Sequence, residues 1–145
     1  MIEINQKAID FTLENQDGIE IKLSDFLGQK ILIYFYPKDM TSGCTKQACS
    51  LQDNMVDLND LNLKIFGISK DSVESHKRFQ EKHGLEFDLL ADTQKSVIKS
   101  YGASKGPFTS RVAYLINEKG NVIYKFSKVD TKIFAQEVID VLNSL

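Results

Sequence analysis

The chain has 145 residues, 42% of them hydrophobic, which predicts a single globular domain spanning residues 1–145. Its 18 basic and 20 acidic residues give a net charge of −2 without any basic block, so the charge pattern does not support nucleic-acid or membrane-surface binding. No apolar run is long enough to span a bilayer, and the first residues lack the apolar segment of a secretory leader. We therefore expect a cytoplasmic protein, in which a permanent disulfide is not expected.

Hydrophobic periodicity and turn residues predict alternating strands and helices. The first part of the chain is expected to form a hairpin from 11–14 and 19–23, a helical turn capped by Ser24 or Asp25 and ended by Gly28, a buried strand at 30–36 and a helix at about 43–60. A buried strand at 63–69, a helix at about 72–83 capped by Asp71 or Ser72 and closed by Gly84, a strand at 87–90, and a helix from Asp92 or Thr93 to about Tyr101 follow. The chain then has a loop at 103–110, a hairpin from 111–116 and 121–126, and a final helix, capped by Asp130 or Thr131, whose inward residues are Ile133, Phe134, Val138, Val141 and Leu142.

This order of elements predicts an α/β fold. Strand–helix–strand units give a sheet a parallel centre, and the late hairpin adds antiparallel strands. We expect a thioredoxin-like fold, with a mixed central β-sheet flanked by helices on both faces and an N-terminal β-hairpin extension. Active residues in such a sheet lie at the carboxyl ends of the parallel strands, where residues 37–44 would be.

Both cysteines of the chain lie near the start of the helix expected at about 43–60. Cys44 is at the helix entrance, and Cys49 is about one and a half turns further along. A helix N-terminus stabilises a thiolate, although a buried thiol at an arbitrary helix position is more often inert packing. The helix start, the turn before it and the Thr41 hydroxyl three residues upstream favour a reactive Cys44.

A thiolate alone does not make a fast reaction, because a less basic thiolate is also less nucleophilic. The site must also stabilise the electrophile with fixed donors. Of the two arginines, Arg78 fits a solvated helix face, whereas Arg111 follows a Gly-Pro loop and opens an apolar strand. A charge at such a strand end is often only the rim of a sheet. Arg111 is nevertheless the arginine placed to reach the Cys44 turn, and its planar, permanently charged group can hold two acceptors.

The spacing of the two cysteines limits how they can pair. In an intact helix, residues five apart lie about 140° around the axis, with Cα atoms roughly 8.6 Å apart. A disulfide requires a Cα separation below ~7 Å, so a Cys44–Cys49 bond would require the first turns to unwind. Cys49 is therefore either a small core residue or a partner that local unfolding delivers to an oxidised Cys44.

Residues 37–44, Pro-Lys-Asp-Met-Thr-Ser-Gly-Cys, resemble the Pro-x-x-x-Thr-x-x-Cys signature of the peroxiredoxins. The segment Cys44-Thr-Lys-Gln-Ala-Cys49 is similar to the cysteine spacing of their bacterioferritin-comigratory, or Q-type, subgroup. The resemblance extends over nearly the whole chain and includes Phe11-Thr-Leu, Asp17-Gly, Tyr34-Phe-Tyr-Pro, Phe66-Gly-Ile-Ser-Lys-Asp-Ser72, His76, Phe79, Leu89-Leu-Ala-Asp92, Tyr101-Gly and Arg111.

This resemblance implies a thioredoxin-dependent thiol peroxidase that reduces hydrogen peroxide and organic hydroperoxides, with roles in antioxidant defence and redox homeostasis. Cys44 would be the peroxidatic cysteine, which peroxide oxidises to a sulfenic acid. Cys49 would be the resolving cysteine, forming an intramolecular disulfide that thioredoxin or a similar dithiol reduces. Thr41 and Arg111 would orient the peroxide and stabilise the thiolate, and Pro37 would shield the pocket.

The resemblance also implies supporting residues and shows departures. Gly43 belongs to the signature segment, and Gln47 occupies a position where the family often has Glu or Gln in a hydrogen-bond network. No metal or organic cofactor is implied. Ile9 stands where many members have proline, which should affect only the N-terminal strand. Ser42 replaces the usual proline before Gly-Cys, so we expect a less rigid loop and lower turnover.

Several alternatives stay open at this point. A thioredoxin-like disulfide oxidoreductase usually has Cys-x-x-Cys, whose closer spacing this chain lacks. A non-catalytic redox sensor or binding module would be oxidised at Cys44 without turnover. His76 and His83 lie on one face of a predicted helix, where surface or packing roles are favoured over a metal pair. We expect a monomer, with a weak dimer allowed, because both cysteines lie on one chain.

Overall fold

The computed structural model describes residues 3–145. Residues 1 and 2 belong to the predicted domain and to the N-terminal segment where no leader is expected, and they lie outside the described residues. The strands are β1 (Thr12–Glu14), β2 (Glu20–Lys22), β3 (Lys30–Phe35), β4 (Leu63–Ser69), β5 (Asp88–Ala91), β6 (Ser104–Lys105), β7 (Phe108–Thr109), β8 (Ala113–Ile116) and β9 (Val122–Phe126). The helices are the 3₁₀ turn η1 (Leu23–Phe26), α1 (Ser42–Asp53), α2 (Met55–Asp60), α3 (Val73–His83), α4 (Ser96–Ser100) and α5 (Phe134–Ser144). Of the described residues, no helix combines the length and the apolar character needed to cross a membrane.

A seven-stranded mixed sheet forms the centre of the molecule, with strand order β2-β1-β5-β4-β3-β8-β9. Strands β3, β4 and β5 are parallel, and β8 and β9 continue the sheet in antiparallel fashion beyond β3. The N-terminal hairpin β1–β2 extends the other edge by pairing with β5. The predicted α/β, thioredoxin-like arrangement is confirmed, with the hairpin extension built into the central sheet.

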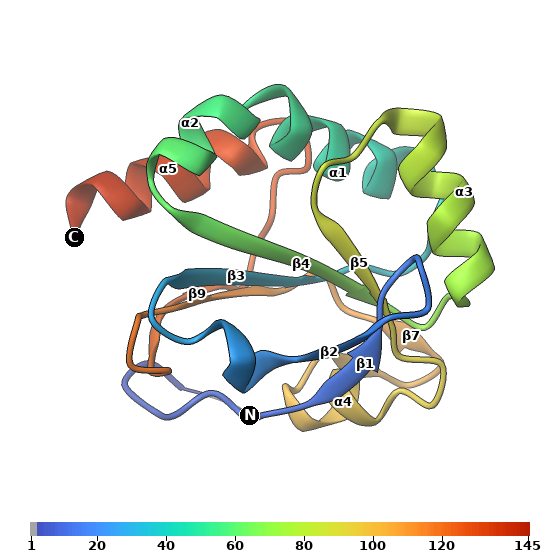
Figure 1. Cartoon of the computed structure of the whole chain (residues 1–145), viewed down its shortest axis with the longest axis horizontal. Helices are drawn as coiled ribbons and strands as arrows, with labels where there is room; N and C mark the ends of the chain where they lie inside the picture. Colours follow the sequence, from blue (N-terminus) through green and yellow to red (C-terminus); the bar gives the residue numbers. More distant parts are fainter. Residues whose placement is uncertain (1–2) are drawn as a thin grey trace.

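Helices cover both faces of this sheet (Figure 1). Helices α1, α2, α3 and α5 lie over one face, and α4 and η1 lie against the other. Strand β3 sends Leu32 and Tyr34 into the first layer and Ile31, Ile33 and Phe35 into the second. Because both faces are buried, this strand is a continuous apolar run rather than an alternating one.

Helix α3 and strand β4 match the sequence prediction closely. Strand β4 spans Leu63–Ser69, as predicted. The Ser72 hydroxyl accepts a hydrogen bond from the Ser75 backbone N–H at 3.2 Å, which caps the start of α3. Gly84 ends the helix in the left-handed region at φ 60°, a conformation that glycine adopts without strain.

The predicted helix at about 43–60 is in fact two helices, separated at Asn54. The Asn54 side-chain amide donates to the Ser50 carbonyl oxygen at 2.8 Å and competes with the helical backbone pattern. The helix expected from Asp92 or Thr93 begins only at Ser96. The Asp92 carboxylate still accepts from a first-turn N–H, that of Ile98 at 2.7 Å, but it does so from four residues upstream of the helix.

Three further boundaries differ from the prediction. The expected loop at 103–110 contains the short antiparallel hairpin β6–β7, which turns at Gly106 with φ 58°. The N-cap of the last helix is Ile133 rather than Asp130 or Thr131, so Ile133 lies before the helix and is 51% exposed instead of facing inward. The cap of η1 is Lys22, whose side chain makes no capping hydrogen bond, rather than Ser24 or Asp25.

Candidate active site

The loop that precedes Cys44 lies at the carboxyl end of the parallel strand β3. The strand ends at Phe35, and α1 begins at Ser42. Thr41 is the N-cap residue, with extended backbone angles φ −78° and ψ 155°. Cys44 therefore lies in the first turn of α1, and it is only 2% exposed. This is the position that the sequence predicts for the reactive thiol.

Arg111 lies beside the Cys44 sulfur. Its Nη1 donates to Cys44 Sγ at 3.3 Å and to Gln47 Oε1 at 2.9 Å. Arg111 comes just before β8, the antiparallel neighbour of β3, and the Phe35 N–H donates to the Val112 carbonyl oxygen at 2.8 Å. This pairing places Arg111 beside the start of the loop that leads to Cys44. The positive charge of its guanidinium therefore lies next to the thiol.

Gly43 makes room for the guanidinium. A Cβ atom at this position would lie 3.1 Å from Arg111 Nη2, closer than carbon normally approaches. Gln47, one turn after Gly43 and fully buried, accepts from the same arginine. The Gln47 Nε2 has no hydrogen-bond partner among residues 3–145, although it is buried. The two supporting residues named from the sequence thus both adjoin Arg111.

Thr41 and Pro37 flank the loop without contacting the sulfur through a hydrogen bond. The Thr41 hydroxyl donates to the Lys38 carbonyl oxygen at 2.9 Å and is exposed. The hydroxyl is thus turned away from the N–H groups that begin α1, and it makes no capping bond. Arg78 is exposed on α3, as expected for a solvated helix face.

Cys49 is a free, partly buried thiol within α1. Its sulfur lies 3.8 Å from Nδ1 of His83, the last residue of α3. Burial raises the pKa of the Cys49 thiol, and the nearby Asp53 carboxylate raises it further. Both cysteines are free in this conformation, in which α1 is continuous from Ser42 to Asp53. The His83 contact is missing from the sequence interpretation, because the two residues are 34 positions apart.

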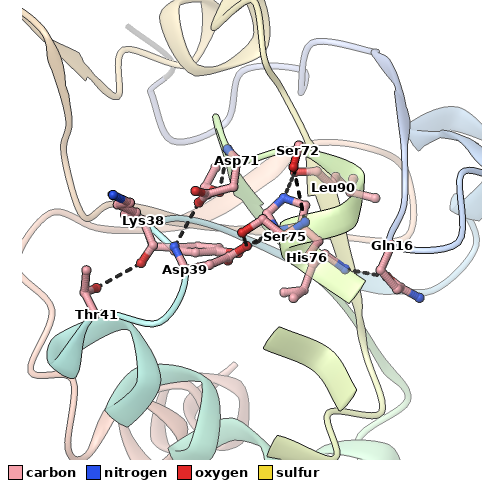
Figure 2. A network of polar contacts seen from close by, with 12 residues as sticks. Gln16, Lys38, Asp39, Thr41, Asp71, Ser72, Ser75, His76 and Leu90 are labelled. Carbon is pink, nitrogen blue, oxygen red and sulfur yellow. Dashed lines mark hydrogen bonds and ion pairs between the residues drawn. The ribbon is translucent and has the colours of Figure 1, made fainter. Parts of the chain in front are cut away.

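A second polar cluster, also missed from the sequence, includes Asp39, Asp71, Ser75 and His76 (Figure 2). The Tyr36 hydroxyl joins it by donating to the Asp39 carboxylate. His76 is fully buried and hydrogen-bonded on both ring nitrogens, so it is not a surface residue. The available sequence signal was the pair of aspartates, one shortly after each of the two central parallel strands. The carboxyl ends of such strands meet at one edge of the sheet.

Comparison with known proteins agrees with this geometry. The pattern of the AhpC/TSA family matches residues 4–125. The peroxiredoxin Bcp of Bacillus subtilis is 38% identical over 152 aligned positions, covering 99% of this chain and 97% of its own. Peroxidoxin BcpB from Mycobacterium tuberculosis has a crystal structure that superposes with a TM-score of 0.93 at 26% identity, covering 100% of this chain and 99% of its own. The bacterioferritin comigratory protein of Xanthomonas campestris, described with an alkyl peroxide reduction activity, gives a TM-score of 0.88 at 27% identity and covers 92% and 90%.

Both the family pattern and the identity over almost the full length decide the assignment. The site holds two free cysteines, with an arginine donating a hydrogen bond to the sulfur of the first. The chain belongs to the AhpC/TSA family and is a peroxiredoxin of the Bcp, or Q-type, kind, a thiol peroxidase.

Proposed function

We propose that Cys44 is the peroxidatic cysteine of this enzyme. Its thiolate attacks one oxygen of the hydroperoxide, the O–O bond breaks, and the other oxygen leaves and takes up a proton as water or an alcohol. The sulfur becomes a sulfenic acid. The observation that carries this proposal is the Arg111 guanidinium, which donates to Cys44 Sγ and Gln47 Oε1 from the same nitrogen. A fixed cation beside sulfur favours the thiolate and can face the charge that develops on the leaving oxygen.

Two residues of the loop and two of helix α1 are proposed to support this step. Thr41 is proposed to orient the peroxide through its hydroxyl, which is one short turn from the sulfur and accessible. Pro37 shields the loop without an N–H that would compete for the thiolate. Gly43 lets the guanidinium approach the helix start, where a side chain would displace it. Gln47 Oε1 accepts a second hydrogen bond from the same Arg111 nitrogen that donates to Cys44, and this fixes the orientation of the guanidinium plane.

Cys49 is proposed to resolve the sulfenic acid. Its thiol attacks the Cys44 sulfur, and the S–O bond breaks with release of water, leaving an intramolecular disulfide. Residues five apart on a wound helix have Cα atoms roughly 8.6 Å apart, beyond the ~7 Å limit for a disulfide. The start of α1 must therefore unwind, and Cys49 must leave His83, before the bond can form.

A dithiol reductant of the thioredoxin type is proposed to complete the cycle by exchange with the Cys44–Cys49 disulfide. The proposed substrates are hydrogen peroxide and small organic hydroperoxides; the alkyl peroxide reduction described for the Xanthomonas relative supports the second class. A reducing cytoplasm suits this cycle, because the enzyme must return to the dithiol after each turnover. With both cysteines on one chain, a monomer suffices for it.

The test uses intact-mass analysis together with a coupled assay. One equivalent of peroxide should convert the reduced protein to a Cys44–Cys49 disulfide, and thioredoxin, its reductase and NADPH should then sustain turnover. Cys44→Ser should abolish turnover, and Cys49→Ser should allow one oxidation but no recycling by thioredoxin. Oxidation of Cys44 once per chain without turnover would instead favour a redox sensor. A flat NADPH trace from a fully reduced protein would contradict the proposal.

A further inference from the structure

A buried hydrogen-bond network ties the loop before Cys44 to helix α3 (Figure 2). Its centre is Asp39, which is 3% exposed, and His76, which is 0% exposed. One carboxylate oxygen of Asp39 accepts from the Tyr36 hydroxyl at 2.6 Å. The other accepts from the Ser75 hydroxyl at 2.9 Å and lies 2.7 Å from His76 Nδ1. On its far side, His76 Nε2 lies 3.0 Å from the Leu90 carbonyl oxygen.

A proton must lie between Asp39 and His76. The Leu90 carbonyl can only accept, so the hydrogen on Nε2 points to it. A bare Nδ1 would then face a carboxylate oxygen at 2.7 Å, lone pair against lone pair. With a proton on Nδ1, the same contact becomes a charge-assisted hydrogen bond between an imidazolium and a carboxylate. Removal of either side chain would leave the other buried without its partner, which is costly.

The same atoms do not form a metal site in this arrangement. Potential ligand atoms of Asp39, Asp71 and His76 lie within 4.8 Å of one another. The separation of 2.7 Å between Asp39 and His76 is nevertheless shorter than the ~3.3 Å expected between two ligands of a tetrahedral zinc ion. The distance is that of a hydrogen bond, and both partners are already occupied by it.

The backbone of the loop is held by the same network. The Asp39 N–H donates to Asp71 Oδ2 at 2.8 Å, and that oxygen also accepts from the Ser69 hydroxyl, at the end of β4, at 2.6 Å. Beside it, the Lys38 carbonyl oxygen accepts the Thr41 hydroxyl. Asp39, two residues before the N-cap of α1, is thus anchored through its side chain to α3 and through its N–H to Asp71, in the turn between β4 and α3.

We propose that the Asp39–His76 pair is a latch on the peroxidatic loop. These positioning residues hold the loop at residues 36–41 in the conformation described here, in which Cys44 contacts Arg111 and which we call the closed loop. Breaking the pair releases this loop, and the rate of release sets how fast the start of α1 unwinds for the Cys44–Cys49 disulfide. The kinetic half of this statement rests on the proposed function, whereas the closed loop itself does not. The two steps need opposite states of one segment, so loss of the latch should speed disulfide formation and slow the attack on peroxide.

Hydrogen exchange on the reduced protein tests the latch without any peroxidase activity. His76→Leu and Asp39→Ala should raise the exchange rate of backbone amides 39–45 by about 10- to 100-fold, the factor for one lost hydrogen bond to a charged group. Asp39→Asn can still accept from Tyr36 and donate to a neutral His76, so its exchange should stay within about threefold of the wild type. Val138→Ala, a buried change in α5, controls for loss of global stability. If His76→Leu does not fold, Ser75→Ala removes one donor to the same carboxylate and should give about 3- to 10-fold.

The second measurement follows Cys44 after one equivalent of peroxide by rapid quenching and mass analysis. In Asp39→Ala, the disulfide should form about 10-fold faster from the sulfenic acid, and less sulfinic acid should accumulate at high peroxide. A general loss of stability, reported by Val138→Ala, should not produce this acceleration. Unchanged loop exchange in His76→Leu and Asp39→Ala would overturn the latch, and faster exchange without a faster disulfide would overturn its kinetic role. Faster exchange in a protein whose wild type forms no Cys44–Cys49 disulfide would leave the latch standing and overturn the proposed function instead.

Discussion

Replacement of Arg111 by glutamine should slow the reactions of Cys44 by removing the positive charge beside the sulfur. In the wild type, Nη1 donates to Cys44 Sγ at 3.3 Å and to Gln47 Oε1 at 2.9 Å. Two unit charges at 3.3 Å interact by about 5 kcal/mol at an effective dielectric constant of ~20, which is a ceiling. Because Arg111 is only half-buried, water replaces part of the lost interaction.

A hydrogen bond to a charged group contributes about 1.5–3 kcal/mol, and this range is the better guide for Arg111. A loss of about 2 kcal/mol lowers the thiolate fraction by up to about 30-fold, but the more basic thiolate that remains is more nucleophilic, so we expect alkylation to slow by about 5-fold. Arg111→Lys keeps the charge but cannot hold both acceptors in one plane, so we expect a smaller loss, about 2- to 3-fold. The oxidation by peroxide should fall further than the alkylation, because Arg111 is also proposed to face the leaving oxygen.

The assay is alkylation of Cys44 by iodoacetamide at pH 7 in a Cys49→Ser background, where Cys44 is the only thiol. Intact mass gives the rate, and far-ultraviolet circular dichroism confirms that each variant is folded. Arg78→Gln is the matched control, because Arg78 is the other arginine of the chain and is exposed on α3. Alkylation of Arg111→Gln within about twofold of the wild type would refute the assignment of this arginine as the group that stabilises the thiolate.

Three further predictions concern the same helix. Thr41→Val should slow oxidation of Cys44 by peroxide by about 10-fold or more while alkylation changes little, and Thr41→Ser should restore most of the rate, because only the peroxide is proposed to need the hydroxyl. Ser42→Pro should slow disulfide formation by about 2- to 5-fold in rapid-quench experiments, because proline stabilises the helix start relative to the unwound chain. Proline is favourable at the first helical position, and the residue before it, Thr41, already has the extended backbone angles that proline requires. A faster disulfide in this variant would contradict the unwinding step. Finally, because burial and Asp53 raise the pKa of Cys49 above 9.0, the stability that this thiol contributes is complete below that pH and is lost as the pH rises through the raised value. Denaturant unfolding should therefore show a smaller decline above about pH 9 in Cys49→Ser than in Cys44→Ser.

The central fold followed from local patterns because its strongest signals are local. The run from Ile31 to Phe35 is apolar on both faces, and strand β3 is buried on both faces. Ser72 and Gly84 bracket α3 because each satisfies a backbone requirement at its own position. The Cys44 turn followed in the same way from a strand end, a turn and a helix start. These features need no knowledge of distant contacts.

The errors have a common physical cause, which is competition from side chains or from distant segments. Asn54 splits the predicted long helix by donating to the Ser50 carbonyl, a contact that hydrophobic spacing does not reveal. His76 looked like a surface or packing residue, but Asp39 and Leu90 are 37 and 14 positions away from it and supply both of its hydrogen-bond acceptors. Cys49 and His83 meet only because α1 and α3 cover the same face of the sheet. Such contacts depend on tertiary packing.

The start of α1 is weak by the ordinary rules of helix capping, and this weakness fits the chemistry. Its first turn contains no acidic residue, and its N-cap side chain makes no capping bond. An acid or a capping hydroxyl would stabilise the helix by about 0.3–2 kcal/mol, but it would occupy the N–H groups and the positive helix end that a thiolate at Cys44 can use. The stability that the helix start lacks is supplied from outside the helix, by Arg111 on the sulfur side and by Asp39 in the loop. These contacts come from outside the helix, so under the proposed latch their loss would release the same segment that they order for attack on peroxide.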